Sequence, residues 1–490
     1  MHVARVGVAL LAVGVAGSGL LGCANDANAP AKNKVPITTA SKKALKEFIA
    51  GRDLAEKLRA TDARAHFSAA ANEDPSFALA YVGLANTAPT AAEFFDAVRR
   101  ATGLVDKVSA GEAHVIRSLE AAMNGHPDEQ LEHLTALVEA YPDDERARFL
   151  LGLFYFNRQE WPRAAAECRR STELNPEFSQ PYNQLGYALR FMQDYAGAEK
   201  AFTKYIELIP DEPNPYDSYA ELLMTTGRFR ESIAQYQKAL SLNPNFANSY
   251  IGIGNDYIFL GEAVQARNSF TTLGFIARNE GEKRTAHLWT ANSYIHEGKT
   301  AKALQEVERM DEIAKRADDR FSMAADLNLM GNILLEAGRP DEALARFAKA
   351  VETAQTAIVT AEVKGAARRN HLFNAGRVAI ARKDLAAAAA AAEQYQRQVD
   401  ERKLPFEVRQ SHELAGLIAL AGGEFPAAVG ELEQANQQDP RVLFNLSSAY
   451  AGAGNADAAR KMLARAANYN AFSLNYAFVR TRALAMLKGS

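Results

Sequence analysis

Cysteine is scarce in this chain of 490 residues, which contains only Cys23 and Cys168. With no Cys-x-x-Cys pair, the sequence holds no zinc or thiol-redox motif of that kind. Cys168 falls within an apolar helical pattern, and we expect it to be a small buried core residue. Cys23 stands apart, because it directly follows an apolar run near the N-terminus.

An excess of positive charge is also missing. Lysine and arginine number 56 against 59 aspartate and glutamate, which gives a formal net charge of −3. This balance provides no electrostatic footprint for nucleic acid, and arginine pairs such as Arg99-Arg100 and Arg368-Arg369 are scattered along the chain. We therefore expect no nucleic-acid partner. Hydrophobic residues make up 48% and charged residues 23%, as in a soluble folded protein.

No apolar run is long enough for a comfortable membrane-spanning helix. The uncharged stretch 6–21 is glycine-rich and falls short of the roughly 20 apolar residues that such a helix needs. Arg5 precedes this stretch and small residues close it, so residues 1–22 are typical of a cleaved secretory signal. A retained membrane anchor is a less favoured alternative.

Leu20-Leu21-Gly22-Cys23 resembles the lipobox of bacterial lipoproteins. The resemblance implies cleavage before Cys23 and a diacylglycerol on its thiol, a reaction that needs a good nucleophile. Ala24 in place of aspartate implies transport to the outer membrane, facing the periplasm. Residues 23–40 are polar and small, so we expect a flexible tether from the lipidated Cys23. The alternative is an ordinary signal followed by a chance cysteine.

Proline recurs at a constant interval, at Pro142, Pro176, Pro210 and Pro244. The two units 179–212 and 213–246 also share a pattern: apolar or aromatic residues at positions 4, 7 and 11, a small residue at 20, an aromatic at 24 and proline at 32. Positions 4, 7, 8 and 11 share one helical face, and the proline ends the second helix.

This pattern resembles the tetratricopeptide repeat, which pairs two helices in a unit of the same length. The resemblance implies an all-α fold, a right-handed superhelix of about eleven helix pairs over residues 41–472. The clearest repeats are 145–280, 324–350 and 409–472, and residues 473–490 are expected to form a capping helix. Small residues at positions 8 and 20 would let the paired helices approach closely. Position 15 is glycine in seven units, where it would supply a left-handed turn: Gly125, Gly227, Gly261, Gly298, Gly338, Gly423 and Gly454.

Three short stretches imitate functional motifs. YIHEGKT (294–300) ends like a phosphate-binding loop, but Ser293 stands where that loop needs its first glycine. GIGNDY (252–257) lacks the third glycine of a dinucleotide fingerprint, and Gly416 replaces the second histidine of a zinc-protease motif that would begin at His412. We therefore expect no nucleotide, metal or cofactor and no catalytic site, although an enzyme with an unrecognised site remains an alternative.

In the tetratricopeptide family the first helix of each pair lines a concave face through positions 2, 5, 9, 12 and 13. An asparagine amide both donates and accepts, so it can bind the backbone of an extended peptide. The hypothesis is that the concave groove binds such a peptide through Asn183, Tyr187, Asp217, Glu221, Asn255, Asn292, Asn328 and Asn332. The alternative is that these residues are simply polar positions on a solvated face.

Taken together, these features predict a non-enzymatic scaffold that binds a protein or peptide partner and is held by lipid at the bacterial cell envelope. The resemblance to repeat lipoproteins implies a role in assembling envelope, secretion or pilus complexes. A structural envelope protein that associates with itself is the second hypothesis.

Overall fold

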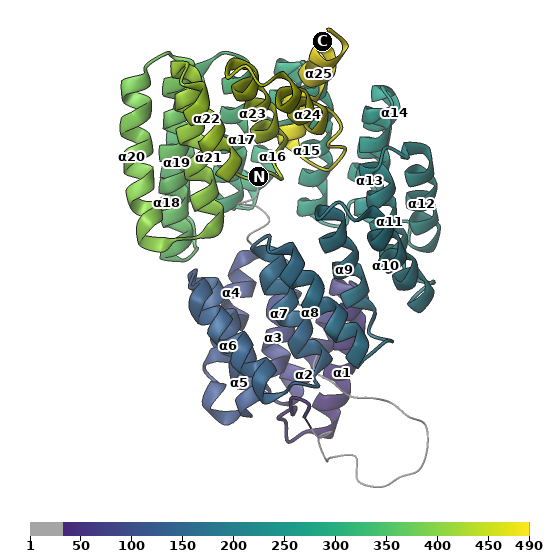
Figure 1. The fold of residues 1–490 in the computed structure, drawn as a ribbon. Coiled ribbons are helices and arrows are strands. Elements are labelled where there is room, and N and C mark those ends of the chain that lie inside the picture. Colours follow the sequence, from purple (N-terminus) through teal and green to yellow (C-terminus); the bar gives the residue numbers. More distant parts are fainter. Residues whose placement is uncertain (1–32, 490) are drawn as a thin grey trace. The chain divides into compact units, whose positions relative to one another are not determined.

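A computed structural model of the chain describes residues 33–489. The expected signal 1–22 and the proposed lipidation site Cys23 lie outside these residues. Between residues 33 and 489 every regular element is a helix, which confirms the predicted all-α class (Figure 1).

The chain divides into two compact units, one ending at Tyr219 and one beginning at Ala220, and the division falls within α11 (Pro213–Thr225). The N-terminal unit contains α1 (Lys42–Glu56), α2 (Ala60–Glu73), α3 (Ala78–Asn86), α4 (Ala91–Thr102), the short 3₁₀ helix η1 (Val105–Lys107), α5 (Ala110–Asn124), α6 (Pro127–Ala140), α7 (Glu145–Asn157), α8 (Trp161–Leu174), α9 (Ser179–Phe191) and α10 (Tyr195–Leu208).

The C-terminal unit continues with α12 (Phe229–Leu242), α13 (Ala247–Phe259), α14 (Ala263–Ile276), α15 (Glu280–His296), α16 (Thr300–Arg316), α17 (Arg320–Glu336), α18 (Pro340–Gln355), α19 (Ala361–Ala381), α20 (Leu385–Arg402), α21 (Pro405–Gly422), α22 (Phe425–Gln434), α23 (Pro440–Gly452), α24 (Ala456–Ala467) and α25 (Leu474–Gly489).

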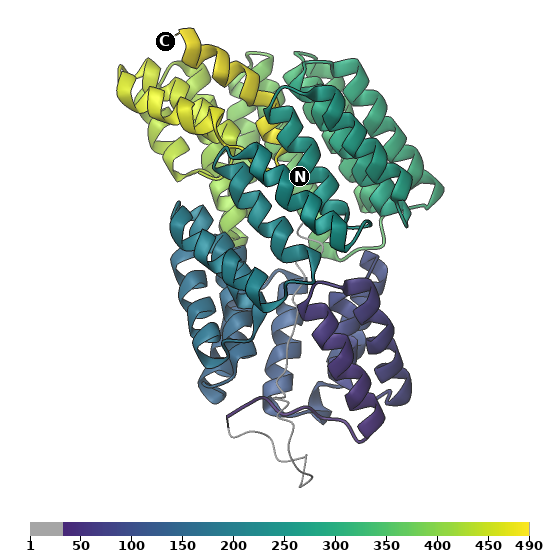
Figure 2. The same ribbon diagram turned by 90° about the vertical axis from the view of Figure 1, so that its right-hand side faces the viewer.

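Within each unit, consecutive helices pack against each other in pairs, and each pair contacts the next, as Figures 1 and 2 show. In the described range, α1 to α24 form twelve pairs, against about eleven expected, and α25 follows them. The shortest pair is that of α3 and α4. This arrangement is the predicted tetratricopeptide solenoid.

The paired helices approach closely because position 8 is small and position 24 fills the space beside it. A Cβ added to Gly186 would lie 2.7 Å from the ring of Phe202, its partner sixteen positions on. Phe67 lies against both Gly51 of its own pair and Gly83 of the next helix. The aromatic side chain therefore joins one pair internally and also joins it to the next.

The turn inside most pairs has a left-handed backbone residue. All seven glycines predicted at position 15 have positive φ, between 69° and 83°. At the end of YIHEGKT, Gly298 closes α15, and the next N–H, that of Lys299, donates to the carbonyl of Tyr294 at 2.8 Å. This is a helix C-terminal motif and not a phosphate loop. Gln193 and Lys383 adopt φ 63° at the same position of their repeats.

Residues 33–40, the described part of the expected tether, are held by the N-terminal unit. The N–H of Val35 donates to Asp144 at 3.0 Å, and the N–H of Thr38 donates to Glu112 at 2.8 Å. The hydroxyl of Thr39 donates to Asp74 at 2.6 Å, and Lys34 forms an ion pair with Glu145. Composition predicted a flexible tether here, whereas acidic side chains at the starts of α5 and α7 and after α2 bind residues 33–40 in this structure.

Candidate functional site

The predicted groove asparagines of the C-terminal unit lie on α13, α15 and α17, the first helices of three successive pairs. Asn255 is 1% exposed and Asn292 is fully buried, whereas Asn328 and Asn332 are half-buried. Two of the four are thus covered in this structure.

Three of these amides donate hydrogen bonds back to their own helix. The Nδ2 of Asn255 donates to the carbonyl of Ile251 at 2.8 Å. In the same way, Asn328 donates to Ala324 at 3.0 Å and Asn332 donates to Asn328 at 2.9 Å. Each amide N–H group therefore bonds to the backbone carbonyl four residues earlier. The side-chain oxygen is left to accept a hydrogen bond from another helix.

Those oxygens accept hydrogen bonds from the first helix of the next pair. Asn255 Oδ1 accepts from Asn292 Nδ2 at 3.4 Å. Asn328 Oδ1 accepts from Asn370 at 3.3 Å, and Asn332 Oδ1 accepts from Arg377 at 2.7 Å. The polar stripe is thus a row of links between neighbouring first helices, a role that spacing within one helix does not reveal.

The helix α25 packs onto the side of the solenoid that the first helices of the pairs line, which we call the inner face. It contacts its neighbour α24, as a terminal cap would, but it also contacts α23 and α15 (Figure 1). Its Tyr476 ring lies 5.5 Å from Phe259 and 5.9 Å from His296, measured between ring centres. Just before the helix, Phe472 lies 5.7 Å from Trp289. The segment expected as a cap therefore also reaches far back along the chain to α15.

Three consecutive residues of α25 contact the last residues of three first helices. Arg480 donates to the carbonyl of Phe259 at 3.0 Å, and Thr481 donates to the carbonyl of His296 at 3.1 Å. Arg482 lies 3.4 Å from the carboxylate of Glu336. Phe259, His296 and Glu336 end α13, α15 and α17, where carbonyls and the helix dipole favour cations.

Beside α25 the inner face carries a charge network in which Arg377, Glu413 and Arg441 are buried. Glu336 lies 3.7 Å from both Arg377 and Arg441, and Arg441 lies 3.8 Å from Glu413. Burial raises the pKa of Glu413 to about 7, and burial together with the nearby Arg441 lowers the pKa of Arg377 to about 10. Asn475 of α25 joins this network by donating to Asp439 at 2.5 Å.

The predicted groove residues of the N-terminal unit are close together on α9 and α11. Asn183 donates to Asn214 at 3.5 Å, and the hydroxyl of Tyr187 donates to Ser218 at 3.3 Å. Asp217 is buried at 2% exposure. Glu221, which belongs to the C-terminal unit, is half-buried.

Half-buried aromatic rings on α7, α8 and α9 lie together, and we call this group the aromatic cluster. Trp161 stacks on Phe191 with ring centres 4.4 Å apart, and Phe156 lies 5.0 Å from Trp161. The guanidinium of Arg190 lies 4.9 Å from the ring centres of both Tyr187 and Phe191. Sequence reasoning named Tyr187 and Phe191 as aromatic groove surface but missed Trp161, because Trp161 begins a second helix and falls outside the groove positions.

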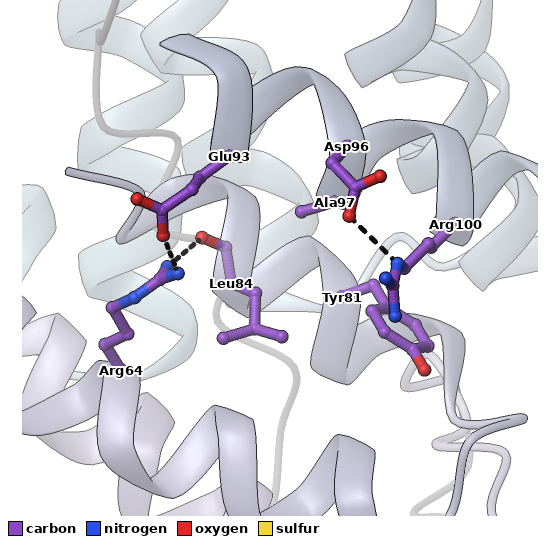
Figure 3. A pocket seen from close by; sticks show the side chains of 7 residues that line it. All are labelled: Arg64, Tyr81, Leu84, Glu93, Asp96, Ala97 and Arg100. Carbon is purple, nitrogen blue, oxygen red and sulfur yellow. Dashed lines mark hydrogen bonds and ion pairs between the residues drawn. The ribbon is translucent and has the colours of Figure 1, made fainter. Parts of the chain in front are cut away.

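A separate hollow of about 430 Å³ opens between α2, α3 and α4 (Figure 3). Its charged groups are matched within the wall, because Arg64 pairs with Glu93 and Arg100 pairs with Asp96. Tyr81 lies beneath Arg100, 5.8 Å from the guanidinium carbon to the ring centre. Among the described side chains that line the hollow, no charged group is left to attract a ligand, so it adds nothing to the site.

Over residues 33–489, no group of three histidine, cysteine, aspartate or glutamate side chains is placed to hold a metal. His287 and His412 instead contact glutamates of the second helix in their own pairs, Glu306 at 2.7 Å and Glu431 at 2.8 Å. Among the helices of the same range, none combines the length and apolar character required to cross a bilayer.

The fold and the inner faces define an α-solenoid of the protein-interaction class. Three sequence models described as Tetratricopeptide repeat match the chain, at residues 118–177 and 328–402, at 179–212 and 214–246, and at 440–465. The chain contains tetratricopeptide repeats, as its periodicity predicted.

Curated relatives share parts of the array. DnaJ homolog subfamily C member 7 of Mus musculus is 28% identical over 136 residues, which is 28% of this chain and 25% of that protein. Superkiller complex protein 3 of Mus musculus is 27% identical over 111 residues, 23% of this chain and 7% of that protein. The chain thus spans a quarter or less of the length of these relatives.

Solved structures match the chain with low sequence identity and low TM-scores. The APC/C hetero-tetramer Cut9-Hcn1 is 16% identical with a TM-score of 0.42, covering 89% of this chain and 79% of that one. MamA is 21% identical with a TM-score of 0.29, covering 32% of this chain and 91% of that one.

Proposed function

We propose that this chain is a non-enzymatic scaffold that binds a protein partner on the inner face of its N-terminal unit. The observation that carries the proposal is the aromatic cluster of Phe156, Trp161, Tyr187, Arg190 and Phe191. Tryptophan, tyrosine and arginine are the residues that most often dominate the binding energy of protein interfaces. Here they are half-buried, so part of each side chain remains accessible to solvent.

The cluster suits a partner segment with apolar side chains and exposed carbonyls. The stacked rings of Trp161 and Phe191 offer a rigid apolar surface at low entropic cost. Next to them on the same helix lie the polar Asn183 and Tyr187, whose long hydrogen bonds to Asn214 and Ser218 would be exchanged for bonds to the partner. An extended peptide of mixed polarity, as the sequence predicted for the groove, would use both kinds of contact.

The cellular setting is the second half of the proposal. The lipobox-like residues ending at Cys23 support cleavage and lipidation there, and Ala24 supports delivery to the outer membrane, facing the periplasm. A scaffold held in this way would act in the assembly of envelope, secretion or pilus complexes. The ordered residues 33–40 support a short connection between such an anchor and the first repeats.

Partner capture in living cells tests the scaffold function. A photo-crosslinking amino acid replaces Asn157, an exposed residue that ends α7 next to the aromatic cluster. Lys200, exposed on α10, is the matched control. A dominant protein adduct at position 157 that is absent at position 200 is the expected result. Adducts with other copies of this chain would favour a structural self-associating protein, and the same adducts at both positions would remove support for the inner face.

The anchor is tested separately by metabolic labelling with a radioactive fatty acid. The Cys23→Ala variant is expected to lose the label, because the acceptor thiol is gone, while Cys168→Ala keeps it. Label that persists in the Cys23→Ala variant would contradict lipidation and the proposed location.

A further inference from the structure

We infer that the inner face of α13, α15 and α17 is a helix-binding groove, and that α25 is its internal occupant, which a partner's basic-aromatic helix replaces. The inference rests on the proposed scaffold function and specifies the partner for the C-terminal unit. The groove is defined by Asn255, Phe259, Asn292, His296 and Glu336.

The contacts of α25 are those of a helix bound in a groove. Tyr476 and Val479 are buried in one apolar cluster with residues of α13 and α15, including Ile251 and Trp289. Leu474 is buried in a second cluster with Ala291 of α15 and Met330 of α17. The occupant thus buries aromatic and aliphatic side chains against three successive repeats, as helix-in-groove recognition requires.

Polar contacts fix the direction of the occupant. Arg480, Thr481 and Arg482 each contact the final residue of a different first helix, Phe259, His296 and Glu336 respectively. Three helix C-termini in a row present carbonyl oxygens and the negative ends of their dipoles. This edge selects a helix that carries basic residues next to its apolar ones.

The fit of α25 is incomplete, which makes it replaceable. Asn292 Oδ1 and His296 Nδ1 are buried on the covered face without a hydrogen-bond partner among the described residues. A buried polar atom left unpaired opposes the docked state. Burial, aided by the positive charge of Arg480, also lowers the pKa of His296 to about 3, so the docked helix keeps this side chain uncharged.

These features describe the partner. It is a protein helix with an aromatic residue, a basic residue four positions later and another two beyond that, as in Tyr476, Arg480 and Arg482. A hydroxyl or amide donor reaching Asn292 or His296 would give it an advantage over α25, because it would pair an atom that α25 leaves unpaired.

The test uses the full chain and a labelled synthetic peptide of residues 472–489 as the probe. Val479→Asp places an unpaired charge at a site that is 1% exposed and should release α25. Met486→Asp, on the exposed part of the same helix, is the matched control. By fluorescence anisotropy, the peptide should bind Val479→Asp at least tenfold more tightly than it binds the unaltered chain or Met486→Asp. A peptide carrying Tyr476→Ala and Arg480→Ala should lose most of that binding.

Hydrogen exchange of α13, α15, α17 and α25 in the Val479→Asp variant shows whether α25 has been released and whether the groove helices remain folded. Retained protection of these helices together with peptide binding supports the groove. Lost protection of α13, α15 and α17 in Val479→Asp would show that α25 is part of the core and would overturn the inference. Unchanged protection of α25 would overturn it as well, because α25 would then not have been released. Retained protection without peptide binding would also overturn it. Each of these results leaves the crosslinking test at Asn157 unaffected, because that residue belongs to the other unit.

Discussion

The guanidinium of Arg480 lies 5.2 Å from the ring centre of Phe259 and donates a hydrogen bond to the carbonyl of the same residue. The two residues are 221 positions apart. In a solenoid most contacts join neighbouring repeats, so stability is roughly a sum over neighbours. This contact departs from that rule, because it links the end of the chain to the start of the C-terminal unit's array.

Arg480→Ala should therefore destabilise the C-terminal unit by about 1–3 kcal/mol, since a charged hydrogen bond and a cation–π contact are lost together. The measurement is urea unfolding, with hydrogen exchange to locate the loss at α13 and α25. Lys488→Ala, at the exposed end of α25, is the control and should change little. Equal effects of the two variants would contradict a specific role for Arg480.

Two glycines of the C-terminal unit should respond oppositely to alanine. A Cβ on Gly331 would lie 2.5 Å from the buried ring of Phe347, whereas a Cβ on Gly430 would meet nothing within 4 Å. Gly331→Ala should destabilise the unit by about 1–2 kcal/mol through overpacking. Gly430→Ala should stabilise it by up to about 1 kcal/mol through helix propensity. Thermal unfolding of both variants gives the comparison, and a stabilised Gly331→Ala would contradict the close packing.

The left-handed turns predict a second pair of opposite effects. Gly298 has φ +69°, and Lys383 has φ 63° at the same position of its own repeat. Because a left-handed residue with a Cβ costs about 1–2 kcal/mol, Gly298→Ala should be destabilising. Lys383→Gly should relieve that strain and raise the unfolding free energy by up to about 1 kcal/mol. Guanidinium unfolding tests both, and a neutral Gly298→Ala would argue against the turn.

Asp256 should make the C-terminal unit less stable as pH rises. Burial raises its pKa from 3.8 to about 8, and Ser232 lowers it only in part. Between these two values the folded state binds more protons than the unfolded state, so stability falls from about pH 4 to about pH 8. Asp256→Asn should be flatter over this window and more stable at pH 8 by a few kcal/mol, at about 1.4 kcal/mol per pKa unit. Melting temperatures of both proteins across this range are the measurement. Parallel pH profiles would show that Asp256 is not the cause.

The repeating parts of this fold can be predicted because they are local. A glycine at position 15 and a small residue sixteen positions before an aromatic one are both set within a single repeat, as in Gly186 and Phe202. Their conformations follow from steric limits on φ and from side-chain volume, which hold wherever the unit recurs. The start and end of each pair therefore need no information from distant residues.

The candidate site could be predicted less well, because distant contacts decide it. The stripe containing Asn255 and Asn292 was assigned by resemblance to the family's concave positions, but a single repeat does not show that α25, at the far end of the same unit, contacts one of its helices. Likewise, Asn332 accepts a hydrogen bond from Arg377 of the next pair, and the repeat pattern does not predict that these two residues are in contact. The residues expected to be a free tether were judged from composition, which does not show that Asp144 and Glu112 bind Val35 and Thr38.

The held segment 33–39 would also act as a mechanical coupling. Asn33 lies ten positions after Cys23, so a chain anchored at Cys23 can place Asn33 no more than about 36 Å from that cysteine. A pull on such an anchor would load the bonds of Val35 to Asp144, Thr38 to Glu112 and Thr39 to Asp74. The load would spread over α7, α5 and the turn after α2 instead of peeling away α1 alone. Tension at the membrane would thus reach the N-terminal solenoid through several helices at once.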